Sequence, residues 1–359
     1  MKIVTIIGAR PQFVKAAMVS KAIKDHNEEG KGKISEIIIH TGQHFDANMS
    51  DIFFNQMGIP KPDYDLGINS LTHGAMTGQM LEKIEKVLIK EKPDWVLVYG
   101  DTNSTIAGAL AAKKIHIKVA HVEAGLRSFN MHMPEEVNRI LTDRISDVLF
   151  CPTDTAMENL TAEGFENMHI KIVKTGDIML DAAKVYSNYA VQPREVLGTN
   201  FVLSTIHRAE NTDSKEKLKN IFSALSKIAS QKQVVLPLHP RTKHYIEKYD
   251  IELSPQIKII NPVGYLEMVW LLSNCCMVVT DSGGVQKEAY FFKKPCITVR
   301  EETEWIELVE INVNFLTGSD ENKILEAYHK VVTNTMNFDI NLYGNGNTRE
   351  TILKELLSN

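Results

Sequence analysis

Three carboxylates lie close together in the segment HVEAGLRSFNMHMPEEVNR, residues 121–139, where a buried strand is expected to end. Glu123 follows the apolar run directly, and Glu135 and Glu136 come later in the segment. Carboxyl groups suit proton transfer when their neighbours push their pKa values apart, so that one group holds a proton and another lacks it. A surface loop explains Glu135 and Glu136 without any function, but it explains Glu123 poorly. The segment is therefore a candidate for acid–base chemistry, with Glu136 expected in a structural role.

Chemically capable side chains also end most of the other apolar runs. The set comprises Arg10, His44, Asp101, Glu123, Asp177, His207, His239 and Asp281. In an open parallel sheet, ligands bind in the crevice beyond the carboxyl ends of the strands. Polar loops would account for any one of these residues, but they account poorly for the whole set. We therefore expect a ligand site at the strand ends.

The elements that must position these groups are short β-branched runs, each followed by a helix-like segment. The runs cover residues 3–8, 34–42, 95–101, 117–125, 147–153 and 169–177 and, after the polar stretch 187–200, residues 201–207, 233–239, 257–262, 276–283, 295–300 and 312–318. Continuous apolar runs that alternate with helices indicate parallel strands buried on both faces. Two such series predict an α/β protein of two Rossmann-like, doubly wound domains that face each other across a cleft.

A phosphate site is indicated where Ser282-Gly283-Gly284 joins a strand to a helix. Small residues there let backbone N–H groups and the positive end of the helix meet an anion such as a diphosphate. Glu288, on the first turns of that helix, is placed to accept hydrogen bonds from two ribose hydroxyls. The spacing G-x-G-x-x-G and the signature G-x-x-x-x-G-K-[ST] are both absent, which argues against a dinucleotide fingerprint and a P-loop.

Two His-Arg pairs accompany this turn in the second series of strands. His207 and Arg208 end its first strand, and His239 and Arg241 end the next. A cationic pair at each of two neighbouring strand ends would neutralise a nucleoside diphosphate. A single histidine is more often structural. The adjacent Arg208 favours a functional role for His207, and both roles stay open for His239.

The composition excludes several classes of protein. A chain of 359 residues with net charge −5 and a pI near 6.2 argues against nucleic acid as a partner. The apolar run at the N-terminus is too short for a signal peptide, and no window reaches the about 18 apolar residues of a membrane span. The four cysteines form no C-x-x-C pair, so no metal site is expected. We therefore expect a cytoplasmic protein without membrane contact.

The motifs resemble, in type and in order, those of one known family. They are GARPQFVK, TGQHFD, GDTNST, HVEAGLR, PEEVNR, TIHRAEN, LHPRT and TDSGGVQKE over residues 8–288, with YGNG near the end. This combination resembles the non-hydrolysing UDP-N-acetylglucosamine 2-epimerases. The resemblance implies a glycosyltransferase-B-like architecture and a homodimer. It implies an N-terminal domain at 1–185, a UDP-binding domain at 200–335 and a last helix at 345–359 that crosses back to the first domain.

The resemblance also assigns roles to residues. Asp101, Glu123 and Glu135 match the catalytic carboxylates of the family. Arg10, His207, Ser282 and Glu288 would bind the UDP, with Lys15 as a further cation of the active site. Taken with the strand-end groups, the expected catalytic residues are Asp101, Glu123, Glu135 and His207. The expected residues for binding the UDP-sugar are Arg10, Lys15, His44, Arg127, Arg208, His239, Ser282, Gly283, Gly284 and Glu288. Arg127 or Arg139 would tune the carboxylates.

The chemistry of a UDP-sugar explains why several carboxylates are needed. C1 carries no carbonyl, so the proton on C2 is not acidified, and the acetamido group blocks oxidation at C2. The accessible route is elimination of UDP across C1–C2 to a glycal, followed by re-addition with the proton arriving on the other face. This route needs a base on one face, an acid on the other, and positive charge for the departing diphosphate. It requires neither a metal nor a nicotinamide cofactor.

Departures from the family pattern narrow the substrate. Arg10-Pro11 and Thr102-Asn103-Ser104 differ from the hydrolysing relatives and favour a product that keeps its UDP. SFNMHM (128–133) is shorter than in typical UDP-N-acetylglucosamine enzymes, and EETEWIELVE (301–310) lacks the usual Arg-Pro after the Thr-Glu. Phe45-Asp46 departs from the motif that binds an activating second UDP-sugar in some members, so that allosteric site is not expected.

These departures resemble the branch that acts on UDP-2,3-diacetamido-2,3-dideoxyglucuronic acid and makes its manno epimer for surface polysaccharides such as O-antigen and capsule. The segments 129–133 and 301–307 are the places where the additional carboxylate and acetamido group would be accommodated. UDP-N-acetylglucosamine stays open as the substrate. A hydrolysing epimerase, a glycosyltransferase of the same architecture and a non-catalytic nucleotide-sugar sensor also stay open as functions.

Overall fold

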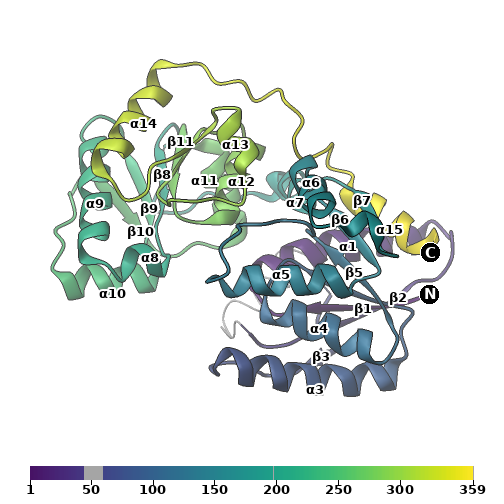
Figure 1. The fold of residues 1–359 in the computed structure, drawn as a ribbon. Helices are drawn as coiled ribbons and strands as arrows, with labels where there is room; N and C mark the ends of the chain where they lie inside the picture. Colours follow the sequence, from purple (N-terminus) through teal and green to yellow (C-terminus); the bar gives the residue numbers. More distant parts are fainter. Residues whose placement is uncertain (44–59, 197, 359) are drawn as a thin grey trace. The chain divides into compact units, whose positions relative to one another are not determined.

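The chain folds into two compact units (Figure 1). The computed structural model describes residues 1–43, 60–196 and 198–358, and of Arg10 it describes only the backbone. The first unit comprises Met1–Lys184 and Asn341–Asn359, and the second comprises Val185–Ile340. The second unit is therefore inserted into the first along the sequence.

The first unit is built on a parallel sheet of seven strands in the order β3-β2-β1-β4-β5-β6-β7. The strands are β1 (Lys2–Ile7), β2 (Ser35–His40), β3 (Tyr64–Asp65), β4 (Trp95–Tyr99), β5 (Lys118–Val122), β6 (Val148–Cys151) and β7 (Lys171–Lys174). Neighbours pair in parallel register, for example Val98 with His121 and Tyr99 with Val122 across β4 and β5. Because all strands are parallel, their carboxyl ends all lie on the same side of the sheet, which we call its carboxyl edge.

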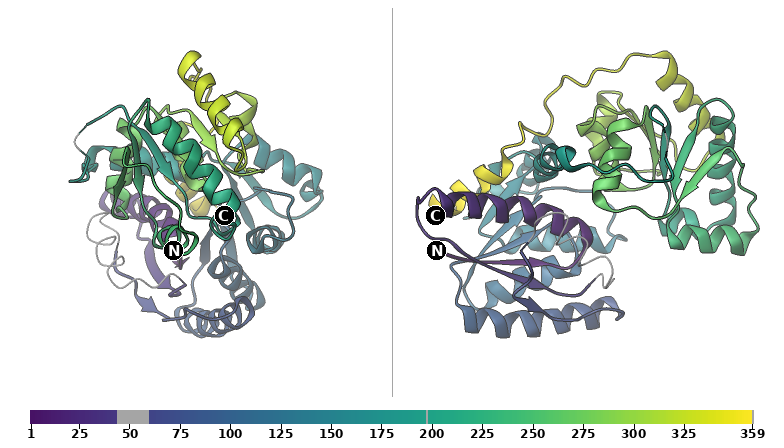
Figure 2. Two further views of the ribbon diagram at one scale, coloured as in Figure 1. Left: turned by 90° about the vertical axis from the view of Figure 1, so that its left-hand side faces the viewer. Right: turned by 180° about the vertical axis from the view of Figure 1, so that it is seen from behind.

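Helices cover both faces of this sheet. They are α1 (Arg10–Glu28), α3 (His73–Glu91), α4 (Asn103–Lys114), α5 (Pro134–Ile145), α6 (Asp154–Ala162), α7 (Ile178–Tyr186) and α15 (Thr348–Ser358), with a 3₁₀ turn η1 at Phe165–Asn167. Helices α3, α4 and α5 pack side by side on one face. Figures 1 and 2 show α1 on the opposite face from α3, and α15 packs against α1.

The strands of the first unit read as continuous apolar runs because both of their faces are buried. Val4, Ile6, Ile39, Val96 and Val98 belong to one core cluster and are 0% exposed. Helix α4 begins after Thr102, whose hydroxyl accepts a hydrogen bond from the backbone of the helix's third residue, a typical N-cap. The edge strand β3 has only two residues.

The second unit repeats the pattern with a six-stranded parallel sheet in the order β10-β9-β8-β11-β12-β13. The strands are β8 (Val202–Thr205), β9 (Val234–Pro237), β10 (Ile257–Ile260), β11 (Met277–Thr280), β12 (Cys296–Thr298) and β13 (Asn314–Leu316). The helices are α8 (Ala209–Thr212), α9 (Lys215–Ala229), α10 (Pro240–Tyr249), α11 (Tyr265–Asn274), α12 (Gly283–Phe291), α13 (Ile306–Glu310) and α14 (Glu321–Thr333), with a 3₁₀ turn η2 at Ser187–Tyr189.

Helix α9 shows how the second core is closed. Its buried residues Leu218, Ile221, Leu225 and Ile228 recur at three- and four-residue spacing and so form one apolar stripe. The hydroxyl of Ser214 caps its first turn. Figure 1 shows α9 beside α14, which it contacts, and both helices pack on the sheet.

The prediction of an α/β protein with two Rossmann-like parallel sheets is confirmed. Each of the twelve apolar runs coincides with a strand, and only β1 begins outside its run, one residue earlier at Lys2. The short strand β3 was not predicted, because its segment KPDYDLG is polar and lacks an apolar run. In the part of the chain that the structure describes, no helix is long and apolar enough to span a bilayer.

Candidate active site

Asp101 lies directly after β4, at the carboxyl edge of the first sheet. The turn passes through Gly100, whose φ of +62° favours glycine. Two side chains of α5 hold the aspartate in place. Arg139 donates a hydrogen bond from its NH2 to Asp101 Oδ2 at 2.6 Å, and Asn138 Nδ2 donates to the main-chain oxygen of Asp101 at 2.9 Å. The side chain of Asp101 is nevertheless 30% exposed, so a ligand can reach it.

Glu123 forms an ion pair with Lys15 of α1 next to this turn. Both side chains are about nine-tenths buried. Glu123 has a φ of +71°, which is uncommon for a residue with a side chain and costs on the order of 1–3 kcal/mol. The N–H groups of Glu123 and Ala124 both donate to the carbonyl of Phe150 at 3.1 Å, and these bonds hold the unusual backbone. Such strain is concentrated at functional sites.

The electrostatic environment keeps the pKa of Asp101 above its ordinary value. Burial is the largest cause of this pKa shift. The positive charges of Arg139 and Lys15 act against it, and the carboxylates of Glu123 and Glu135 add to it. Glu135 lies on the first turn of α5 and is exposed. The structure thus brings the three predicted carboxylates into one electrostatic cluster with two cations.

A glutamine that was not predicted as a site residue joins the turn after β1 to the carboxyl end of β4 through hydrogen bonds. Gln12 is buried on the first turn of α1, and its Oε1 accepts hydrogen bonds from the N–H groups of Gly8 and Ala9 at 2.8 and 2.9 Å. Its Nε2 donates to Tyr99 O at 2.7 Å and to Thr105 Oγ1 at 3.0 Å. The signal was present in GARPQ, because a glutamine at the third helical position can accept a hydrogen bond from the backbone N–H of the N-cap residue.

The turn after β1 requires glycine because the chain approaches its neighbours closely there. A Cβ on Gly8 would lie 2.1 Å from Ser104 Oγ and 2.2 Å from Thr41 Oγ1. The two hydroxyls are hydrogen-bonded to each other at 2.8 Å. The backbone of Arg10 follows this turn at the start of α1, while its side chain and the whole of His44 lie outside the described residues.

In the second unit, Asp281 organises the end of β8. It is fully buried and accepts hydrogen bonds from the N–H groups of His207 at 3.0 Å and Arg208 at 2.9 Å. Asn211 Nδ2 donates to the same carboxylate at 3.1 Å. The His207 ring lies with Nδ1 at 3.4 Å from Asp281 Oδ1. Burial lowers the pKa of His207, the charge of Asp281 opposes this pKa shift, and Arg208 adds to it.

His239 lies beside His207, with ring centroids 5.4 Å apart. It is the N-cap of α10, where its Nδ1 accepts a hydrogen bond from the N–H of Arg241 at 3.1 Å. Burial is the largest cause that lowers the pKa of His239, and the neighbouring His207 lowers it further. The two predicted strand-end histidines are therefore in contact.

The Ser282-Gly283-Gly284 turn forms the start of α12, as predicted. Ser282 is the N-cap, and its hydroxyl accepts a hydrogen bond from the N–H of Val285 at 3.5 Å. A Cβ on Gly284 would meet nothing within 4 Å, so this part of the turn is open. Glu288 lies on the same helix and is 7% exposed.

Cations flank this turn. A Cβ on Gly283 would lie 3.8 Å from Arg208 NH2 and 3.8 Å from Arg300 NH1. It would also lie 3.5 Å from Glu304 Oε2, which pairs with Arg300 at 3.1 Å. Arg208, whose side chain is 30% exposed, can meet an anionic ligand at this open helix start, whereas Arg300 is 1% exposed and paired with Glu304.

Comparison with known proteins agrees with this arrangement of two parallel sheets. The sequence profile of the family described as UDP-N-acetylglucosamine 2-epimerase matches residues 26–357. The chain belongs to the UDP-N-acetylglucosamine 2-epimerase family. It is therefore an isomerase of the UDP-sugar 2-epimerase type, and the predicted family is confirmed.

Relatives of this epimerase come from bacteria and archaea. It is 56% identical over 358 residues to the UDP-2,3-diacetamido-2,3-dideoxy-D-glucuronate 2-epimerase of Pseudomonas aeruginosa, with 99% of each chain covered. It is 52% identical to a UDP-N-acetylglucosamine 2-epimerase homolog of Methanococcus maripaludis, again with 99% of each chain covered. Its structure matches that of the Methanocaldococcus jannaschii UDP-GlcNAc 2-epimerase in complex with UDP-GlcNAc and UDP, with a TM-score of 0.90, 43% identity and full coverage of both chains.

One residue prediction for this epimerase is wrong. We expected Arg127 to bind the UDP-sugar or to tune the carboxylates, but its side chain is 0% exposed. Its NH1 donates to Asp143 Oδ2 at 2.7 Å, and its Nε and NH2 donate to the two oxygens of Glu163 at 2.6 and 2.9 Å. All three guanidinium nitrogens are therefore engaged within the protein, and Arg127 has a structural role.

Glu136 has the structural role that was expected of it. It is buried and accepts hydrogen bonds from Ser128 N and Oγ, both at 2.8 Å, and from Phe129 N at 3.0 Å. It also lies 3.3 Å from Arg139 NH1. The loop before α5 is thus linked through Glu136 and Arg139 to Asp101.

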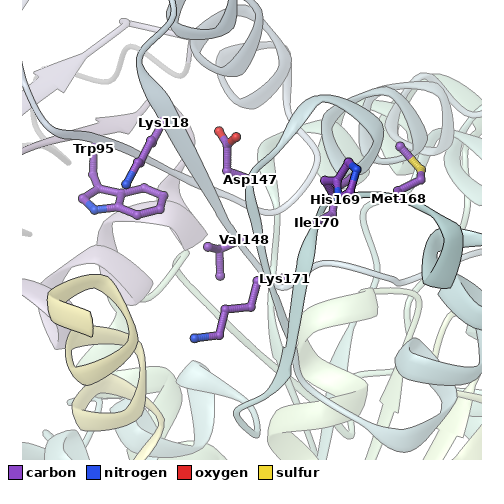
Figure 3. A pocket seen from close by; sticks show the side chains of 8 residues that line it. All are labelled: Trp95, Lys118, Asp147, Val148, Met168, His169, Ile170 and Lys171. Atoms are coloured by element: carbon purple, nitrogen blue, oxygen red, sulfur yellow. The ribbon is translucent and has the colours of Figure 1, made fainter. Parts of the chain in front are cut away.

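A separate pocket of about 440 Å³ lies at the amino ends of the strands of the first sheet, away from the carboxyl ends that carry Asp101 and Glu123 (Figure 3). Its lining residues are Trp95, Lys118, Asp147, Val148, Met168, His169, Ile170 and Lys171. Trp95, Lys118 and Lys171 are the first residues of β4, β5 and β7. This pocket is therefore at the amino ends of the strands and is not part of the candidate site of the epimerase.

Proposed function

We propose that this epimerase inverts C2 of UDP-2,3-diacetamido-2,3-dideoxy-D-glucuronate without hydrolysing it. The observation that carries the proposal is the 56% identity to the Pseudomonas aeruginosa enzyme of that name, over nearly the whole of both chains. The identity to the UDP-GlcNAc 2-epimerase of Methanocaldococcus jannaschii is lower, at 43%. UDP-N-acetylglucosamine is the second candidate, because the structural match to that enzyme covers the whole of both chains.

The segment after β12 supports the uronate. The family pattern places Arg-Pro after Thr-Glu, and here Trp305 and Ile306 stand there. Trp305 Nε1 donates a hydrogen bond to the carbonyl of Gly283 at 2.9 Å, and the Lys287 ammonium lies 4.2 Å from the centroid of its ring. Trp305 thus packs on the Ser282-Gly283-Gly284 turn, which we propose as the diphosphate site. A change of side chain at position 305 therefore changes the protein surface next to the bound UDP-sugar.

The loop before α5 supports the same substrate. Phe129 has a φ of +57° and is 70% exposed, and Met131 is 62% exposed. The loop is held in this shape by the buried Glu136. The exposed apolar side chains of this fixed loop, which leads directly into the first turn of α5 and Glu135, are placed to meet the methyl group of an additional acetamido substituent.

The reaction we propose is elimination and re-addition. A carboxylate removes the C2 proton while the C1–O bond breaks, and the bonding electrons leave with UDP to give a 2-acetamidoglycal. A second carboxyl group then delivers a proton to the other face of C2, and the β-phosphate oxygen adds to C1 again. We assign the proton transfers to Asp101, Glu123 and Glu135. The raised pKa of Asp101 suits it to the acid form, and the ion pair with Lys15 favours ionised Glu123.

The departing UDP needs positive charge and hydrogen-bond donors. We assign this role in the second unit to His207, Arg208, His239, Ser282, Gly283 and Gly284, with Glu288 for the ribose. In the first unit we assign it to Arg10, Lys15 and His44. The adjacent imidazoles of His207 and His239 and the Arg208 guanidinium beside Gly283 support this assignment. We further propose a cytoplasmic homodimer that supplies a precursor of surface polysaccharide.

Proton NMR in deuterated water tests the proposal. Purified protein is incubated with the diacetamido uronate and, separately, with UDP-N-acetylglucosamine, and Asp101→Asn serves as the control. We expect the uronate to invert and to gain deuterium at C2, while Asp101→Asn is silent. Inversion of UDP-N-acetylglucosamine alone would replace the proposed substrate by the second candidate. Release of free sugar with UDP would make the protein a hydrolysing epimerase, and silence with both would leave a sensor or a transferase.

A further inference from the structure

His121 is a fully buried histidine of β5 that the proposed reaction does not use. Its Nε2 lies 2.7 Å from the carbonyl oxygen of Gly100, and its Nδ1 lies 2.7 Å from Asp143 Oδ1. Its residue exposure is 0%. A carbonyl oxygen only accepts hydrogen bonds, so Nε2 must carry a proton.

The other ring nitrogen also faces an acceptor. Asp143 Oδ2 accepts a hydrogen bond from Arg127 NH1 at 2.7 Å and from the N–H of Gly125 at 3.2 Å. Two donors on one carboxylate oxygen, one of them a cation, favour the ionised form of Asp143 without any contribution from His121. An ionised Asp143 has no proton to donate, so Nδ1 of His121 must carry one as well.

The charges around the ring agree with this protonation state. The ionisable groups packed here are Asp143 of α5, Arg127, Glu163 after α6, and the Cys151 thiol of β6. Burial raises the pKa of the thiol, so it is neutral. Arg127 bridges the buried Asp143 and Glu163, and the Glu163 side chain is 26% exposed, so water solvates part of that charge. A cationic His121 gives the fully buried Asp143 a second positive partner beside Arg127.

The ring also fixes the turn that carries Asp101. The N–H of Gly100 donates to Val122 O at 3.0 Å, and its carbonyl accepts from His121. Both main-chain polar groups of Gly100 are therefore bound to β5, and Asp101 is the next residue. We propose that His121 is a permanently protonated positioning residue. Its ring donates a hydrogen bond to the carbonyl of Gly100 and so fixes the backbone of the Gly100–Asp101 turn, while Arg139 binds the side chain of Asp101.

The protonation state is tested on the wild-type protein. Ring ¹⁵N NMR of histidine-labelled protein at pH 8 reports each ring nitrogen, and an ordinary histidine with a pKa of ~6.5 is only about 3% protonated there. We expect His121 to show two protonated nitrogens, with its signal assigned by its loss in His121→Gln. If that variant does not fold, neutron diffraction from wild-type crystals at pH 8 locates the hydrogens directly. A single protonated nitrogen by either method overturns the inference.

The positioning role is tested by turnover and UDP binding, and this part rests on the proposed function. His121→Gln keeps a polar side chain but cannot be cationic, and the exposed His169→Gln is the matched control. We expect His121→Gln to lower kcat about 100-fold, as a displaced catalytic group does, with the Kd for UDP within about threefold of the wild type. His169→Gln should match the wild type. Unchanged kcat in His121→Gln, with an active wild type, would overturn the role.

The two parts separate the possible failures. If the wild type turns over neither UDP-sugar, the proposed function fails, and the ring ¹⁵N spectrum still decides whether His121 is cationic. If the wild type is active and His121 has one protonated nitrogen, the function stands and the inference fails.

Discussion

The guanidinium of Arg139 lies 2.6 Å from Asp101 Oδ2 and so joins α5, the helix that carries Glu135, to the turn after β4. The two residues are 38 positions apart in the sequence. Through this contact, the helix that supplies one candidate proton carrier also sets the position and the charge environment of another.

Replacing Arg139 tests that relationship. Its positive charge lowers the pKa of Asp101 against the effect of burial, so Arg139→Gln should raise this pKa further. With Asp101 acting as the acid, the fall of kcat at high pH should then move to higher pH, while kcat at its maximum drops about 10- to 100-fold from lost positioning. Arg139→Lys keeps the charge and is the control. A pH–rate profile with the same high-pH limb in Arg139→Gln and the wild type would contradict the proposed acid.

The Lys15–Glu123 ion pair should contribute to both stability and turnover. Lys15→Met leaves a carboxylate that is about nine-tenths buried without its cation, and we expect the free energy of unfolding to fall by about 3–5 kcal/mol. Urea unfolding measures this change. The double variant Lys15→Met/Glu123→Gln removes the uncompensated charge, so it should regain stability while remaining inactive. Recovery of activity in the double variant would exclude Glu123 as a proton carrier.

Removal of the Glu136 carboxylate should release the loop before α5. Glu136→Ala breaks three hydrogen bonds to Ser128 and Phe129, and we expect a loss of stability of about 1–3 kcal/mol. Amide hydrogen exchange should accelerate at Ser128 and Phe129, which donate to Glu136. Leu203, in the core of the second unit, is the internal reference. Equal protection of the loop in both proteins would show that Glu136 does not hold it.

The titration of His207 should report the diphosphate. Burial lowers its pKa, so the NMR midpoint in the free protein should be below ~6.5. A histidine with a lowered pKa stabilises the fold above pH ~6.5, and this contribution is lost as the pH falls through the midpoint. Binding of UDP should raise the midpoint, because an anion favours the charged ring. Asp281→Asn should lower the midpoint in the free protein, since the charge of Asp281 raises the pKa. A midpoint that UDP leaves in place would remove His207 from the diphosphate site.

Much of the fold could be predicted because parallel strands buried on both faces must be apolar along their whole length. The same logic located Asp101 and Glu123, since strands that run in one direction bring their carboxyl ends to one edge. The strand β3 was missed because its two residues, Tyr64 and Asp65, form no apolar run. Its pairing with β2 is decided by the rest of the sheet.

The partners of the buried charges could not be predicted. Arg127 is close to Glu123 in the sequence, which suggested that it tunes that carboxylate, but the side chain points to Asp143 and Glu163. Asp143 is 22 residues from His121, and their contact exists only because α5 packs on β5. Gln12 was similarly hidden, because its hydrogen bonds reach the end of a strand 87 residues away.

The return of the last segment to the first unit has a consequence for the order of events during synthesis. Helix α15 buries Ile352, Leu353 and Leu356, and Asp181 accepts hydrogen bonds from the N–H groups at its start. The ribosome makes the second unit between these two partners, which takes about 10–30 s at ~5–20 residues per second. During that interval the surface of α1 that receives α15 lacks its cover. A nascent chain that stops before α15 therefore contains Asp101, Glu123 and Glu135, but the apolar surface of α1 in the same unit is still exposed. Only a chain that includes α15 can bury that surface.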